Sequence, residues 1–316
     1  DAQESRGLGD VYKRQELNHN YNLDTLAIFA STDDVQVVRM PIDTTERVVI
    51  SDSFATRDLV RDMASAVHFY AVVITRNMAR LIEASNDRVV AEFQPEDDKQ
   101  NNMENIPFPI DNNGLYMTSD GGSDRSSNNE SSHLKEFFNQ VDKSVQELWG
   151  EHKLPLVIVG DAKNIGYYKE VCDRPDNIIA TVSNVTNLDD GSAQHIVDSV
   201  QEAVEEYRTS LHHAALGEID KARGANMLQT DLQEVYRSAF QGAGETLYVR
   251  RWYIQPAKID EKAQSLTPVD DASGEGVTDD AIGVIIEHVM HNGGDVIFLP
   301  EEIMGEDQPI ALVTRY

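Results

Sequence analysis

Basic residues are scarce in this chain of 316 residues: 27 Lys and Arg stand against 55 Asp and Glu, which gives a net charge of −28. Proteins that bind nucleic acids over a wide surface neutralise phosphates with basic side chains. The balance therefore argues against an extended RNA contact and against DNA as a partner. A solubilising acidic surface is the plainer interpretation, and one local basic patch is compatible with it.

Cysteine and long apolar runs are also rare. Cys172 is the only cysteine, which excludes an internal disulfide and suits a reducing compartment, so a cytoplasmic location is expected. No run approaches the roughly 20 apolar residues of a membrane-spanning helix, so we expect a soluble protein without a membrane partner. Apolar residues make up 40% of the chain, enough to build the cores of about two or three domains.

Several nucleotide and catalytic motifs are missing. There is no G-x-x-x-x-G-K-S/T, no G-x-G-x-x-G that opens a helix after a strand, and no G-x-S-x-G. The sequence therefore predicts no nucleotide cofactor and gives no support for a Ser-His-Asp triad. His288 and His291 lie three residues apart on a predicted helix, but no third ligand is evident, so no metal is expected.

The first fifteen residues need separate treatment. Residues 1–15 have neither an initiator Met nor the layout of a signal peptide, and RGLGDVYKRQ resembles a translated sequencing-library adapter. We interpret them as an artefactual leader and residues 16–65 as the remnant of an N-terminal domain. Within that remnant the pattern predicts a β-hairpin over 25–40, a short strand over 47–50 and a short helix or turn over 54–63.

Residues 66–185 are predicted to form one α/β domain. Its long segment 95–132 is rich in Asn, Asp, Ser and Gly, and structureless loops of this length are usually functional or disordered. Apolar residues then recur at helical spacing from Leu134, with Ser131 or Ser132 as the N-cap. The remaining expected elements are a hairpin formed by residues 66–75 and 78–84, a third strand over 89–94 and a buried strand over 155–160.

Residues 186–316 alternate between helical and strand patterns, which predicts a three-layer α/β/α domain with a mostly parallel or mixed sheet. Thr230 and Thr278 are expected to cap two of its helices, and residues 266–278 to form a loop. Expected strands cover 246–254, 295–300 and 309–316.

The best basic and aromatic cluster is Arg250, Arg251 and Trp252, followed by Tyr253. Such a cluster is able to contact RNA by ion pairing and stacking. The alternative is a strand end at which arginine stems cover apolar surface and the aromatic rings join the core.

Several stretches, taken in their order, resemble one family. They are LAIFAS with VVRMPI, HFYAVVITRNMARLIEAS, HLKEFFNQVDKSV, TLYV, and DDAIGVIIEHVMHNGGDVIFLPEEIMGEDQPIALVTRY. Together they resemble bacterial archaeo-eukaryotic release factor family 3, relatives of class-one peptide-chain release factors and Pelota. The resemblance covers about residues 16–316. It implies an α/β release-factor fold, with the ribosome, tRNA and a translational GTPase as partners and no cofactor.

In that family a Gly-Gly-Gln loop of the middle domain enters the peptidyl-transferase centre and places the water that hydrolyses peptidyl-tRNA. The resemblance puts the tip at Gly121, Gly122 and Ser123, where Ser123 replaces the Gln. A backbone N–H survives this replacement, but the shorter side chain would place water differently. Asp120 and Asp124 add negative charge beside the glycines.

Three functions remain open on the sequence. The first is a factor that hydrolyses peptidyl-tRNA, and the second is a Pelota-type factor that binds and remodels ribosomes without catalysis. The third is an acidic interaction protein that keeps the fold but has left translation. The altered tip favours the second over the first, and the charge favours the third. A translation-related factor with weak or no hydrolysis is the function we expect.

Overall fold

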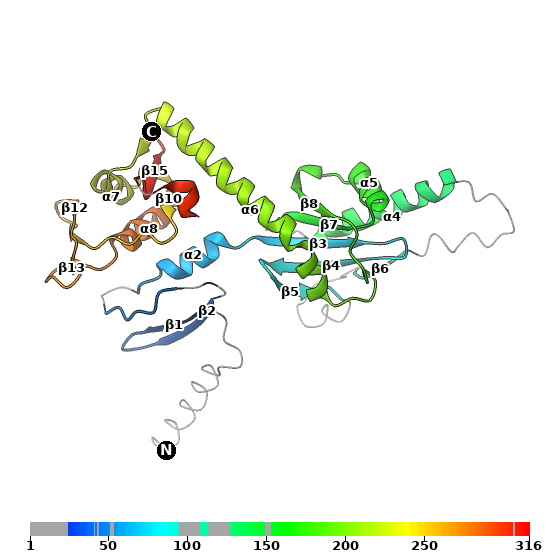
Figure 1. Cartoon of the computed structure of the whole chain (residues 1–316), viewed down its shortest axis with the longest axis horizontal. Helices are drawn as coiled ribbons and strands as arrows, with labels where there is room; N and C mark the ends of the chain where they lie inside the picture. The colour runs from blue at the N-terminus through cyan, green and yellow to red at the C-terminus, as the bar shows by residue number, and fades with distance from the viewer. Residues whose placement is uncertain are drawn as a thin grey trace, which may run out of the picture. The chain divides into compact units, whose positions relative to one another are not determined.

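The computed structural model describes residues 25–40, 42, 44–50, 54–94, 108–112, 127–148, 153–305 and 307–316. These residues form a mixed α/β structure with several sheets (Figure 1). The chain divides into two compact units, and each is described by itself. The first unit combines residues 1–65 with 213–316, and the second comprises 66–212. Helix α6 (Ala193–Gly224) supplies residues to both units.

The second unit is built on one mixed sheet in the order β5-β4-β3-β7-β8, with β6 paired to β4. Strands β3, β7 and β8 run parallel, whereas β4 pairs antiparallel with both β3 and β5. The predicted hairpin and third strand are thereby confirmed. The strands are β3 (His68–Ile74), β4 (Met78–Ser85), β5 (Arg88–Glu92), β6 (Ile110–Asp111), β7 (Leu156–Gly160) and β8 (Ile178–Val182).

Helices cover both faces of this sheet. Tyr70, Val72 and Ile74 of β3 share a core with α4 (Ser127–Leu148) and α5 (Ala162–Val171). The alternate residues of β3, which are Phe69, Ala71 and Val73, pack instead with the N-terminal half of α6. Because successive side chains of a strand point to opposite faces, a strand covered on both sides is apolar throughout.

Helix α4 confirms the predicted helix but not its start. Leu134 and Phe138 are buried as the spacing predicted. The helix begins at Ser127, so Ser131 and Ser132 are not its N-cap. The first turns of α4 contain only polar residues, so the periodic spacing of apolar residues that predicted the helix is absent there.

The predicted loop over 95–132 is also corrected where the structure describes it. Strand β6 lies inside this segment and pairs with β4, and Phe108 beside it is fully buried. The residues around β6 are held in place by one buried aromatic ring and by a strand pairing of two residues. Neither feature produces a periodic pattern in a polar sequence, so the sequence did not predict this strand.

The first unit contains a four-stranded sheet in the order β14-β10-β15-β9. Strand β10 pairs parallel with β14 and antiparallel with β15, so the sheet is mixed. Helices α7 (Leu232–Phe240) and α8 (Ala281–His291) pack on one face. The C-terminal part of α6 and helix α9 (Glu301–Met304) pack on the other. The strands are β9 (Leu228–Gln229), β10 (Gly244–Arg250), β14 (Asp295–Leu299) and β15 (Ile310–Thr314).

A small antiparallel sheet includes the two ends of the loop predicted over 266–278. It has the order β12-β11-β13, with strands β11 (Ala257–Asp260), β12 (Ser265–Pro268) and β13 (Val277–Thr278). Buried Ala257 and Leu266 join the core that contains α7 and α8. The Gly- and Asp-rich residues 269–276 form no strand, so the loop is confirmed there.

The predicted helix caps were displaced by one or two residues. Asp231, not Thr230, caps α7, and Asp280, not Thr278, caps α8. Helix α8 ends with Asn292 as its C-cap, and Gly293 after it has a positive φ of 71°. A glycine accepts this left-handed conformation without strain.

The N-terminal segments belong to the first unit. Strands β1 (Thr25–Ala30) and β2 (Val35–Met40) form the predicted hairpin, and α2 (Arg57–Ser65) is the predicted short helix. The strand predicted over 47–50 is wrong, because this stretch is irregular and Ile50 is 96% exposed. Residues 47–50 have the composition of a strand, but they pair with no strand in the described structure. None of the helices in the described ranges has the length and apolarity needed to span a bilayer.

Candidate functional site

The predicted catalytic tip, Gly121, Gly122 and Ser123, lies outside the described residues. Its described flanks meet at one place, the turn between β3 and β4. On the entering side, the Asn112 N–H donates to the Asn77 carbonyl oxygen at 2.6 Å, and Asn112 Nδ2 donates to the Arg76 carbonyl oxygen at 2.8 Å. On the returning side, Glu130 of α4 forms an ion pair with the Arg76 guanidinium. The chain therefore leaves and re-enters the described structure at the same turn.

The two flanks differ in how firmly they are held. Asn112 is 5% exposed and satisfies two backbone carbonyls, so its anchorage is desolvated. The Arg76–Glu130 pair is exposed, and such pairs contribute about 0–1 kcal/mol. The more firmly held of the two described flanks is therefore Asn112 with the turn that it contacts, rather than the start of α4.

The predicted RNA-binding residues lie where β10 ends. The strand stops at Arg250, so the strand predicted over 246–254 is too long, and Arg251 and Trp252 form a turn. The Arg251 N–H donates to the carbonyl oxygen of Leu299 at 2.8 Å, which holds this turn against β14. Trp252 is 47% exposed, whereas Arg251 is half-buried.

Two arginines of α2, which the sequence analysis did not single out, join this cluster. The Arg61 guanidinium lies 4.1 Å from the centre of the Trp252 ring system, a cation–π contact. Arg57 Nη2 donates to the Arg251 carbonyl oxygen at 3.3 Å. Both arginines are 3% exposed. Their i, i+4 spacing places them on one face of the helix, a signal that the sequence did contain.

Most charges in this cluster already have partners. Arg57 pairs with Asp280 at 3.2 Å and Arg61 with Asp58 at 3.5 Å, while Arg250 Nε lies 3.8 Å from Glu301. Within the described part of the chain, no carboxylate pairs with Arg251. Arg251 is therefore the residue of this cluster that is chiefly available to an anion. One face of the Trp252 ring system is available for stacking with a base or another ring, because Arg61 covers the other face.

Burial lowers the pKa of the Arg61 guanidinium, Asp58 opposes this effect, and Arg57 and Arg251 reinforce it. Two of these three arginines have a carboxylate partner, Asp280 for Arg57 and Asp58 for Arg61.

His288 packs against aromatic side chains of the first unit. Its ring packs against Tyr236 and Phe240, with centroid distances of 5.9 and 5.1 Å. Burial lowers the pKa of its imidazole. No group of three or more His, Cys, Asp or Glu side chains in the described ranges is arranged to hold a metal ion.

Two α/β units, each with helices on both faces of its main sheet, define a multi-unit α/β protein. The model of bacterial archaeo-eukaryotic release factor family 3 matches residues 68–243, which is more than half of the chain. The chain belongs to this family, as the sequence resemblance indicated.

One solved structure shares the fold of this chain with a TM-score above 0.5. A model of ribosome-bound archaeal Pelota and ABCE1 matches with a TM-score of 0.51 at 14% identity, and covers 93% of this chain and 80% of Pelota. S. cerevisiae Dom34, described as a translation termination-like factor that interacts with Hbs1, matches with a TM-score of 0.42 at 14% identity, covering 82% and 67%. The archaeal termination factor aRF1 gives a TM-score of 0.27 at 16% identity, covering 93% and 76%. A search of curated protein sequences found no match.

Proposed function

We propose that this protein acts on ribosomes as a rescue factor of the Pelota kind, with slow or absent hydrolysis of peptidyl-tRNA. Membership of release factor family 3 carries the proposal. The fold shared with a Pelota that is ribosome-bound supports it. Ribosome-bound tRNA and a translational GTPase are the proposed partners, the cytoplasm is the proposed location, and no cofactor is required.

The proposed arrangement of domains follows the release-factor plan. Residues 16–65 are the remnant of the first domain, 66–185 form the middle domain that carries the tip, and 186–316 form the third domain. In the structure the first half of α6 packs with the sheet of the second unit, through Ile196, Val197, Val200 and Val204. We propose that α6 is the connection between the middle and third domains.

Ribosome binding is the direct test. The full chain is expected to co-sediment with ribosomes at moderate salt, and Arg251→Ala is expected to weaken binding about tenfold, the effect of losing one well-placed phosphate contact. Arg88→Ala, an exposed arginine of β5, is the matched control, because it removes the same charge from the second unit.

If Arg251→Ala and Arg88→Ala weaken ribosome binding equally, binding depends on overall charge and Arg251 has no specific role. Failure of the wild type to sediment would favour the second candidate, an acidic interaction module without a role in translation. The specific observation behind that candidate is the net charge of −28, which disfavours contact with ribosomal RNA.

The tip gives a separate prediction about catalysis. Wild-type protein is expected to release labelled peptide from ribosome-bound tRNA slowly or not at all, and Ser123→Gln is expected to raise the rate about tenfold or more, since a long amide side chain can position water. Asp120→Asn with Asp124→Asn should add to the gain by removing charge near phosphates.

Ser123→Pro is the control, because proline removes the backbone N–H that could stabilise an oxyanion. If Ser123→Gln leaves the rate unchanged and Ser123→Pro abolishes a measurable rate, the backbone alone acts. Release by the wild type at the rate of a Gly-Gly-Gln factor would contradict the prediction and make the protein a hydrolase.

A further inference from the structure

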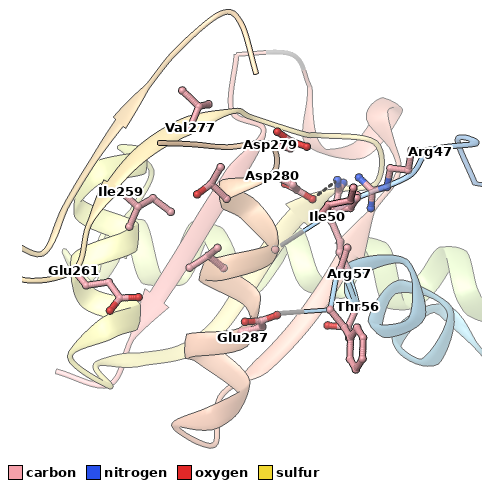
Figure 2. A pocket seen from close by; sticks show the side chains of 16 residues that line it. Arg47, Ile50, Thr56, Arg57, Ile259, Glu261, Val277, Asp279, Asp280 and Glu287 are labelled. Carbon is pink, nitrogen blue, oxygen red and sulfur yellow. Dashed lines mark hydrogen bonds and ion pairs between the residues drawn. The ribbon is translucent and has the colours of Figure 1, made fainter. Parts of the chain in front are cut away.

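A cavity of about 420 Å³ lies within the first unit (Figure 2). This volume falls in the range of roughly 300–1,000 Å³ that is usual for small-molecule sites. Its walls come from the segment that leads into α2, from β11 and the turn after it, and from β13 with the start of α8. Every lining residue belongs to the same compact unit.

The charges around this cavity do not balance. Arg57 and Asp280 form a pair with each other at 3.2 Å, and Arg47 is engaged by Asp58, which is not a lining residue, at 3.0 Å. The three other lining carboxylates have no ion-pair partner within the described ranges: Glu261, Asp279 and Glu287. The cavity is therefore negative overall, and an anionic ligand is disfavoured.

The carboxylates are spread along the cavity rather than gathered at one point. Figure 2 shows Asp279 and Asp280 near each other, with Glu261 and Glu287 apart from them and from each other. Aliphatic side chains line the wall, including Ile259 and Val277. A ligand that satisfies this lining has separated positive groups joined by an apolar stem.

Glu287 is an exposed carboxylate on α8, and its local environment favours a cationic ligand. Partial desolvation raises the pKa of its carboxyl group, and no neighbouring base lowers it. An ammonium group within about 4 Å would favour the ionised carboxylate and offset that desolvation. A neutral apolar ligand would instead bury the carboxylates further without satisfying them.

We propose that this cavity binds a linear aliphatic diamine or polyamine. Its ammonium groups contact the separated carboxylates of Glu261, Asp279 and Glu287, and its methylene groups lie against Ile259 and Val277. This site is independent of ribosome binding and of the tip. The same chemistry, an alkylammonium group on an apolar stem, is also offered by the lysine side chains of a peptide.

The test is calorimetric titration of the full chain with 1,5-diaminopentane at moderate salt. We expect binding with one site per chain. Pentylamine, with one charge, should bind at least fivefold more weakly, and 1,5-pentanediol should not bind. The double variant Glu261→Gln with Glu287→Gln should weaken diamine binding about tenfold, since each lost charge removes a partly desolvated ion pair.

Glu245→Gln with Glu302→Gln is the matched control, because it removes two exposed carboxylates of the same unit that do not line the cavity. The control should bind the diamine like the wild type. Asp279→Asn changes a different lining residue and is expected to weaken diamine binding about threefold. It tests the proposal if the double variant does not fold.

An acetylated and amidated Lys-Ala-Lys peptide distinguishes the two sources of the cation. Tighter binding of the peptide than of the diamine would assign the site to a basic protein segment, and the reverse would assign it to free polyamines. Absence of binding by both probes would overturn the proposal. Equal weakening by the lining and control variants would also overturn it, because the cation would then be held by the acidic surface in general.

Discussion

Replacing Asp280 by Ala is expected to lower the free energy of unfolding of the first unit by about 4 kcal/mol. Asp280 has two functions in the structure. Its Oδ1 accepts a hydrogen bond from the Ile282 N–H at 3.1 Å and so caps α8. Its Oδ2 pairs with Arg57, which is 3% exposed. Loss of a cap costs about 1 kcal/mol, and a buried guanidinium left without its carboxylate costs about 3 kcal/mol or more.

Two further substitutions separate these contributions. Asp280→Asn keeps a capping oxygen, because Asn caps helices about as well as Asp, but removes the charge, so it should recover about 1 kcal/mol and still destabilise the unit by about 3 kcal/mol. Asp279→Asn is the control: this neighbour is exposed and has no ion-pair partner in the described structure, so its effect should stay within about 0.5 kcal/mol. Hydrogen exchange of the α8 amides in increasing urea reports on this unit alone.

Equal losses from Asp280→Ala and Asp280→Asn would show that the cap contributes nothing. A loss below 1 kcal/mol for Asp280→Ala would contradict the buried ion pair itself.

The same ion pair explains why the RNA-binding hypothesis from the sequence needs refinement. Arg57 is 223 residues from Asp280 and 194 from Arg251 along the chain, yet it bonds to both. Arg61 in the next turn of α2 covers one face of Trp252. The basic and aromatic residues therefore also fasten α2 within the first unit, and Arg251 is the member best placed to meet a phosphate.

The parts of the fold that could be predicted are those with a local pattern. Strand β3 is apolar throughout and α4 buries Leu134, Phe138 and Val141 on one face, and both were predictable for that reason. Strands β6 and β13 have two residues each and exist only through pairing with a distant strand. The caps of α7 and α8 were displaced because Thr and Asp, both good capping residues, stand close together before each helix.

The candidate sites divide in the same way. The resemblance alone suggested Gly121, Gly122 and Ser123, since a polar sequence around two glycines carries no signal of its own. The acidic cavity was not predictable, because its walls come from segments that begin near Arg47 and end near Glu287. The i, i+4 pair Arg57 and Arg61 was visible in the sequence, but nothing local connected it to Trp252.

The second large effect is expected at Asp142, on the helix that follows the tip segment. Asp142 is 1% exposed, and its carboxylate accepts hydrogen bonds from the Tyr168 hydroxyl at 3.0 Å and from the Asp173 N–H at 3.1 Å. Gln146 donates a further bond from the same helix. In the described ranges no cation pairs with this buried carboxylate, so its donors alone offset its desolvation.

Asp142→Ala is expected to destabilise the second unit by about 3 kcal/mol, because it leaves the buried Tyr168 hydroxyl without a partner. Tyr168→Phe removes one donor and should cost about 1.5 kcal/mol. The double variant should cost at least about 1 kcal/mol less than the sum of the two, since the residues share one bond. Additive losses would contradict the coupling. Glu147→Gln, an exposed carboxylate of the same helix, is the control and should stay within about 0.5 kcal/mol.

Alkaline pH provides a second readout of the same contact. Burial first, and then the charge of Asp142, raise the pKa of the Tyr168 hydroxyl well above its usual value. Above a pH of about 10 the unfolded tyrosine loses its proton while the folded one keeps it, so the unfolded state binds fewer protons and stability falls as pH rises. Urea unfolding of the second unit at pH 8 and pH 10.5 should therefore show a smaller loss for Tyr168→Phe than for the wild type. Equal losses would show that Tyr168 titrates alike in both states, against the buried bond to Asp142.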